Sequence, residues 1–191
     1  VYVASDGRWE RSLVGDELER EHQRLLETLR YRPEVEWAAY RHDNGAVKII
    51  SDSGAGLMRR EGQRFIYSYE GSDPLELGFS SANVHESEAL ELTMDGRFPD
   101  ALEQLSQIFT SERTGDLVVT SKPGYDLRGK REWPEHRSSH GALCREHMKV
   151  PILSNRPLSV SGPARTVDIF PTIAESLDLT STKSIPGRSL W

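Results

Sequence analysis

The run Asp116-Leu117-Val118-Val119-Thr120 contains three apolar residues that follow one another without interruption. Short continuous apolar runs are typical of strands buried on both faces, as in the interior of a parallel sheet. A second run, Val150-Pro151-Ile152-Leu153, has the same character, although Pro151 favours a sheet edge or a strand start. We therefore expect residues 117–120 and 150–153 to be strands of one sheet.

Helical patterns lie on either side of these runs. Apolar residues recur at helical spacing over 99–109 and over 15–31, so each segment is expected to bury one helix face. A last helix is expected over 168–177, where Asp168 would cap the first turn and Pro171 is tolerated only within that turn. Helices that pack against short apolar strands are typical of an α/β layer fold.

Residues 33–80 are rich in strand and turn signals. Residues 35–40 and 46–51 resemble two strands, and Asp43-Asn44-Gly45 between them is typical of a hairpin turn. Further along, Phe65, Tyr67 and Tyr69 alternate with other residues, as in a half-buried strand. We expect this stretch to form a small β-rich insertion.

The expected domain organisation follows from these patterns. Residues 1–32 and 81–191 would form the α/β core, from which the insertion 33–80 projects. The opening residues Val1-Tyr2-Val3-Ala4 resemble a strand entered in mid-course, so the natural polypeptide is expected to begin upstream.

Composition and charge exclude several kinds of partner. The 191 residues carry a net charge of −6, from 30 acidic and 24 basic residues that are interspersed, so we expect no basic face for a nucleic-acid polymer. The longest apolar runs are too short to span a bilayer. Because Cys144 is the sole cysteine, the chain has no disulfide framework and no cysteine-based zinc site, and its redox compartment stays open.

The connection 121–149 is where the sequence favours chemistry. A loop that leaves the carboxyl end of a strand in an open α/β sheet lies where ligands bind. This one holds His136, His140 and His147, and neutral imidazole is a common ligand of catalytic zinc. Spacing alone does not separate a metal ligand from an ordinary solvated loop histidine. Cys144, three residues before His147, is interpreted as a small buried cysteine rather than a nucleophile.

Several short motifs in the last part of the chain have a fixed order. They are Gly115-Asp116-Leu117-Val118-Val119, Lys122-Pro123-Gly124-Tyr125, Ser139-His140-Gly141, Met148 with Val150-Pro151-Ile152, Arg165-Thr166-Val167-Asp168-Ile169-Phe170-Pro171-Thr172 and Gly187-Arg188-Ser189-Leu190. In these motifs and in their order the chain resembles the end of type I phosphodiesterase and nucleotide pyrophosphatase proteins, a family of the alkaline phosphatase superfamily.

The resemblance implies a fold and a function. The fold would be the carboxyl-terminal part of an alkaline-phosphatase-like α/β/α layer fold, and the intact protein would be a metal-dependent hydrolase of phosphate diesters or related esters acting on a small-molecule substrate. Its Thr or Ser nucleophile and most of its metal ligands would lie upstream, so this chain holds no catalytic residue and should be inactive alone. His140 matches the late His-Gly motif and would be one ligand of a two-metal site, usually zinc.

The resemblance also sets limits. Ser5-Asp6-Gly7 lacks the histidine of the family's Asp-His pair, so Asp6 receives no ligand role. A single imidazole binds weakly, and we expect no metal to be bound tightly through His140 alone. Two alternatives stay open: a sulfatase or phosphomutase of the same superfamily, and a binding module that kept the fold without the chemistry. Upstream residues would separate them.

Overall fold

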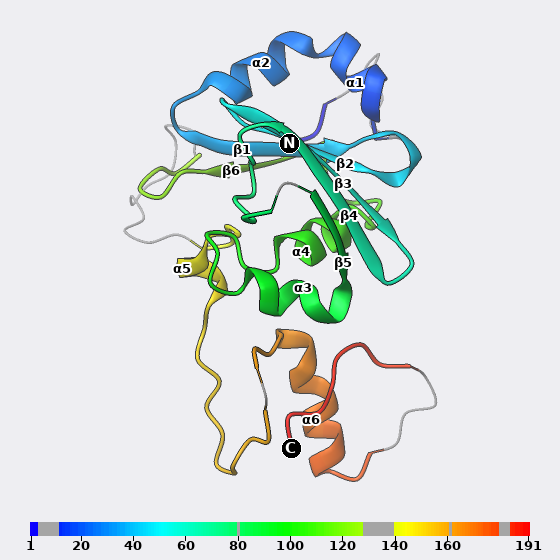
Figure 1. Cartoon of the computed structure of the whole chain (residues 1–191), viewed down its shortest axis with the longest axis vertical. Helices are drawn as coiled ribbons and strands as arrows, with labels where there is room; N and C mark the ends of the chain where they lie inside the picture. The colour runs from blue at the N-terminus through cyan, green and yellow to red at the C-terminus, as the bar shows by residue number, and fades with distance from the viewer. Residues whose placement is uncertain (4–11, 80, 128–139, 161, 180–183) are drawn as a thin grey trace. The chain divides into compact units, whose positions relative to one another are not determined.

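The computed structural model describes residues 1–3, 12–79, 81–127, 140–160, 162–179 and 184–191. Their contacts divide the chain into two compact units, Val1–Lys149 and Val150–Trp191. Figure 1 shows the elements of both. None of the helices in these residues has the length and apolar character that a membrane crossing requires.

The first unit is built on an antiparallel sheet with the strand order β5-β4-β3-β2-β1-β6. The strands are β1 (Val35–Arg41), β2 (Val47–Ile50), β3 (Gly54–Glu61), β4 (Arg64–Gly71), β5 (Ser81–His85) and β6 (Leu117–Ser121). The fold is therefore mixed α/β, as expected, but its sheet is antiparallel where the sequence favoured a parallel one.

Helices cover both faces of this sheet (Figure 1). They are α1 (Gly15–Glu21) and α2 (Gln23–Tyr31) on one face, and α3 (Glu86–Thr93) and α4 (Ala101–Ile108) on the other. Successive residues of a strand point to opposite faces, and alternate residues of β1 pack on the two faces of the sheet. Trp37 and Ala39 pack in the cluster that includes α3 and α4, whereas Ala38 and Tyr40 pack in the cluster that includes α1 and α2.

Several predicted elements are confirmed. The hairpin of β1 and β2 pairs Ala38 with Ile50, and its turn holds a short 3-10 helix, η1 (Asp43–Gly45). The predicted strand at Phe65 to Tyr69 lies in β4, and the predicted helix 99–109 is α4. The helix expected over 15–31 forms as α1 and α2, which meet at His22.

The strand predicted at residues 117–120 forms, but its predicted place in the sheet is wrong. β6 lies at the edge of the sheet and runs antiparallel to β1, whereas an interior strand of a parallel sheet was expected. Beyond it, Leu117 exchanges two backbone hydrogen bonds with Val1, of 2.7 and 3.1 Å. The buried Asp116 carboxylate accepts backbone N–H groups of Val3 and Leu13, at 2.7 and 2.8 Å. A run of apolar residues predicts that a strand is buried, but it does not predict whether the strand pairs parallel or antiparallel.

The prediction of a strand at 150–153 is also wrong. These residues lie outside helix and strand, and Val150 and Leu153 are 67% and 93% exposed. They belong to the second unit, so they do not share the sheet of β6. Pro151 cannot donate a ladder hydrogen bond, which disfavours pairing at the middle of so short a run.

Residues 33–80 supply β1 to β4, so their predicted β content is confirmed. These strands form the centre of the sheet, with β5 and β6 at its two ends. The contacts divide the chain after Lys149, at a boundary that the sequence did not indicate.

The second unit contains η2 (Thr166–Asp168) and α6 (Ile169–Ser176), which together confirm the predicted last helix. Pro171 lies in the first turn of α6, where its missing N–H removes no helical hydrogen bond. The Thr172 hydroxyl donates to the Asp168 carbonyl at 2.6 Å and accepts the Leu190 N–H at 3.0 Å. These bonds hold the carboxyl-terminal residues against α6.

Candidate functional site

His140, the predicted metal ligand, is exposed and lies outside helix and strand. Gly141 follows it with φ +89°, a backbone conformation that glycine adopts without strain. Among the described residues, His140 is in no group of three histidine, cysteine or carboxylate side chains close enough to share an ion. His136 and Asp6 lie outside the described residues.

Cys144 and His147 take structural positions. Cys144 is 8% exposed and packs in the core cluster on the α4 side of the sheet, as expected of a small buried cysteine. His147 lies in the short helix α5 (Arg145–Met148), and its ring Nδ1 accepts the backbone N–H of Ala142 at 3.2 Å. The exposed His147 ring thus closes the turn that follows His140.

The Lys122-Pro123-Gly124-Tyr125 motif forms a turn directly after β6. The Tyr125 N–H donates to the Lys122 carbonyl at 3.1 Å, and Gly124 has φ +90° with open space around its Cα. The Ser121 hydroxyl donates to the Tyr125 carbonyl at 2.9 Å. Glycine at this position is therefore required by backbone conformation rather than by close packing.

Lys122 also lines a polar cavity of about 670 Å³. Arg97 pairs there with Glu36 at 2.6 Å and with Glu76 at 2.7 Å, and Lys122 lies 3.8 Å from Asp52. Burial raises the pKa of Glu36, and the Arg97 guanidinium opposes this shift without cancelling it. Arg97 and Lys122, which line this cavity, are therefore already paired with carboxylates.

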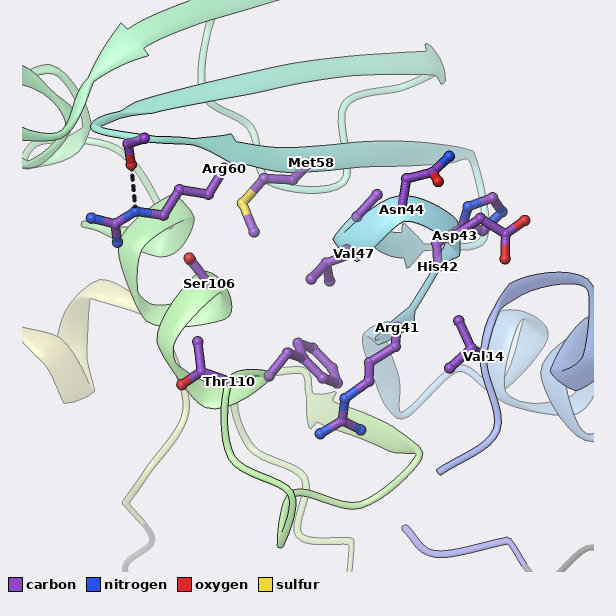
Figure 2. Close-up of a pocket in the computed structure, with 14 residues that line it drawn as sticks. Val14, Arg41, His42, Asp43, Asn44, Val47, Met58, Arg60, Ser106 and Thr110 are labelled. Carbon is purple, nitrogen blue, oxygen red and sulfur yellow. Dashed lines mark hydrogen bonds between the residues drawn. The ribbon is translucent and has the colours of Figure 1, made fainter. Parts of the chain in front are cut away.

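A second cavity, of about 640 Å³, opens beside the β1–β2 turn (Figure 2). Arg41 lines it and donates to the Ser111 carbonyl at 2.7 Å, with its guanidinium 5.3 Å from the ring centre of Phe109. The turn residues His42 and Asp43 form part of the same wall. Its polar lining thus combines this turn with Arg41, Arg60, Ser106 and Thr110 from other parts of the unit.

At this turn the fold assembles a group of possible metal ligands. One donor atom from each of Asp16, His42 and Asp43 lies within 4.8 Å of the others. The sequence analysis did not single out this group. Adjacent His42 and Asp43 are visible in the sequence, but Asp16 comes from α1 and meets them only because α1 packs beside the end of β1.

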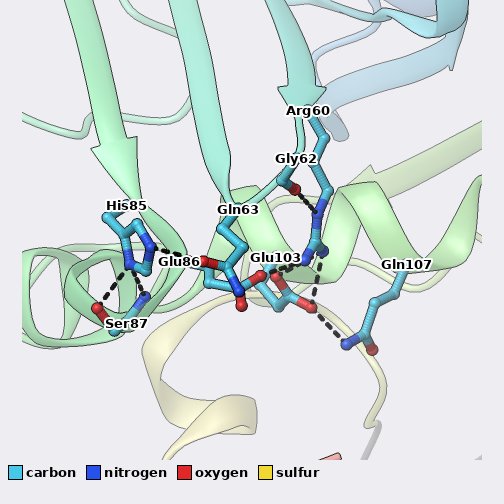
Figure 3. Close-up of polar contacts among 8 residues, drawn as sticks. All are labelled: Arg60, Gly62, Gln63, His85, Glu86, Ser87, Glu103 and Gln107. Carbon is cyan, nitrogen blue, oxygen red and sulfur yellow. Dashed lines mark hydrogen bonds and ion pairs between the residues drawn. The ribbon is translucent and has the colours of Figure 1, made fainter.

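Another polar network joins β3 to the helices on the α4 side (Figure 3). The Arg60 guanidinium donates to Glu103 at 3.2 Å and also pairs with Glu86. Glu103 is 8% exposed and accepts the Gln107 amide at 2.6 Å as well. Because Glu86 of α3 and Glu103 of α4 both pair with Arg60 of β3, the network links α3 and α4 to the sheet.

Comparisons of the chain with protein-family models, curated proteins and solved structures give no significant match.

Proposed function

We propose that this chain supplies the carboxyl-terminal part of a metal-dependent hydrolase of phosphate diesters or related esters, in which His140 is one ligand of a two-metal site. The proposal rests on the ordered motifs and on the way the fold uses them. Its main support is that two motifs distant in the sequence meet at Asp168, whose carboxylate accepts backbone N–H groups of Arg165 and Arg188 at 2.8 and 2.9 Å.

The glycines of the motifs support the same reading. Gly124, Gly141 and Gly187 all have φ near +90°, where residues with a side chain are strained. A Cβ on Gly187 would also collide with the Val167 carbonyl, from the motif that it meets. These three motif glycines are therefore required by their own backbone, as expected if the motifs are structural units.

His140 has the chemistry and the access that the proposed role needs. Its ring is exposed, and a neutral imidazole can offer one nitrogen to a divalent ion. Two bound divalent ions would lower the pKa of a Thr or Ser nucleophile and offset charge on the phosphoryl oxygens. In this proposal the nucleophile and the other ligands come from a segment upstream of Val1, and His140 contributes one ligand to the site.

The test compares His140→Ala with His147→Ala in a polypeptide that includes the upstream segment. Zinc content and hydrolysis of bis(p-nitrophenyl) phosphate are measured for both. His140→Ala should lose metal and at least on the order of 100-fold in activity, because a ligand is removed. His147→Ala should retain both. Full activity of His140→Ala would refute the assignment, and an upstream segment without nucleophile, aspartates and an Asp-His pair would favour a binding module.

A further inference from the structure

We propose that Asp16, His42 and Asp43 form a divalent-cation site of the zinc type, separate from His140 and independent of the proposed hydrolase function. One imidazole and two carboxylates suit zinc, which in open sites takes three protein ligands and leaves a fourth position for water. The donor atoms already lie within 4.8 Å of one another. Ligands of a tetrahedral zinc ion are roughly 3.3 Å apart, so small side-chain rotations would close the group around an ion.

A carboxylate outside this group lies beside the His42 ring. Its Nε2 is 3.7 Å from Oε1 of Glu19, and that oxygen accepts hydrogen bonds from Lys48 at 2.7 Å and from Tyr40 at 2.9 Å. A carboxylate beside one ring nitrogen favours the proton on that nitrogen, which leaves the other nitrogen as the metal donor. Metal-bound histidines commonly have such a carboxylate partner.

The backbone holds the two carboxylates near the histidine. Asp43 lies in a turn closed by bonds from the His42 N–H to the Ala46 carbonyl at 2.7 Å and from the Ala46 N–H to the Asp43 carbonyl at 3.2 Å. Gly15, with φ +48°, lies where any Cβ would collide with the Asp43 carboxylate. Glycine at the start of α1 thus lets this carboxylate approach the helix that carries Asp16.

The exposure and the charge of the Asp16, His42 and Asp43 group both favour the binding of a cation. Asp16 and Asp43 are exposed, and His42 and Asp43 border the 640 Å³ cavity of Figure 2, which provides an entry path. Two carboxylates beside one imidazole are repelled by each other unless a positive charge lies between them. In the proposed site a divalent ion supplies that charge.

The experiment titrates ZnCl₂ into the 191-residue chain by calorimetry, with the imidazole nitrogen resonances of the six histidines followed by NMR. We expect one zinc ion per chain with micromolar affinity, and a large shift of one His42 nitrogen. His42→Asn and Asp43→Asn should each weaken binding at least about tenfold, and Glu19→Gln should weaken it as a positioning change, by about tenfold. Circular dichroism confirms that each variant is folded.

His140→Asn and His147→Asn are the matched controls, and both should bind zinc as the unchanged chain does. Absence of zinc binding up to millimolar concentration would overturn the inference. Binding lost in His140→Asn and kept in His42→Asn would also overturn it, while leaving the proposed hydrolase site in place. Loss in His42→Asn and Asp43→Asn, with binding kept in both controls, would support it whatever the result for hydrolysis.

Discussion

The carboxylate of Asp168 accepts the backbone N–H of Arg188, twenty residues further along the chain, at 2.9 Å. The same side chain accepts the N–H of Arg165 at 2.8 Å, so it serves both as the cap of η2 and as the anchor of the final residues. Asp168 was predicted to cap the helix expected over 168–177 rather than to take part in chemistry. Its side chain makes no cap bond to α6 and instead completes a capping box at η2 by accepting the N–H of Arg165.

Replacing Asp168 by Ala should therefore loosen the whole second unit. Two backbone N–H groups lose a charged acceptor, and the residue is only 6% exposed, so we expect a loss of about 2 kcal/mol in the free energy of unfolding. Urea unfolding measures this loss, and hydrogen exchange at the Arg188 amide locates it. Asp178→Ala is not a fair control because Asp178 has φ +52°, so exposed Asp178→Asn is used. Unchanged exchange at Arg188 in Asp168→Ala would contradict the anchoring role.

Substitutions at two glycines near the proposed cation site distinguish backbone strain from a steric collision with Asp43. Gly15 and Gly45 both have positive φ, but a Cβ would collide with Asp43 only at Gly15. Gly45→Ala should cost about 1 kcal/mol through backbone strain alone. Gly15→Ala should cost about 1–2 kcal/mol more, because it must also displace the Asp43 carboxylate. Thermal unfolding gives both values, and equal losses would show that Asp43 moves without cost.

The sequence predicted best the elements whose signals are local. Turn residues at Asp43 to Gly45 determine the β1–β2 hairpin, and apolar spacing determines α4. It failed where the answer depends on a distant partner. Val118 and Val119 form the expected strand, but the direction of β6 depends on its pairing with β1, which lies some eighty residues earlier (Ala39 pairs with Val118).

The candidate sites divide in the same way. His140 was found through a motif, and its side chain is exposed. Among the described residues it is in no group of three possible metal ligands. The group of Asp16, His42 and Asp43 has no motif, because its members come from a helix and a turn that meet only in the folded chain. Tertiary packing brings such residues together, so their proximity cannot be predicted from a local sequence pattern.

The contact between Arg60 and Glu103 should contribute measurably to stability. Glu103 is nearly buried, and Glu103→Ala removes an acceptor from both the Arg60 guanidinium and the Gln107 amide. Because Arg60 keeps its contact with Glu86 and is partly exposed, we expect a loss of about 1–2 kcal/mol. Glu91→Ala, at an exposed position of α3, should change stability by less than about 0.5 kcal/mol. Urea unfolding at pH 7 compares the two, and equal effects would contradict a structural role for the network.

Glu19 should make stability depend on pH. Burial raises its pKa, but the Lys48 and Tyr40 hydrogen bonds outweigh burial and leave the pKa below the ordinary value of 4.5. The folded chain therefore releases this proton more readily than the unfolded chain, so the contribution of Glu19 is present above pH 4.5 and is lost as the pH falls through the lower folded value. Glu19→Gln should cost about 1 kcal/mol at pH 7, and this difference should shrink steadily below pH 4.5. Glu21→Gln, whose partner Arg20 is exposed, should show little difference at either pH. Chemical unfolding between pH 3 and pH 7 checks the trend, and a difference for Glu19→Gln that stays constant over that range would mean that the ionised carboxylate is not what stabilises the fold.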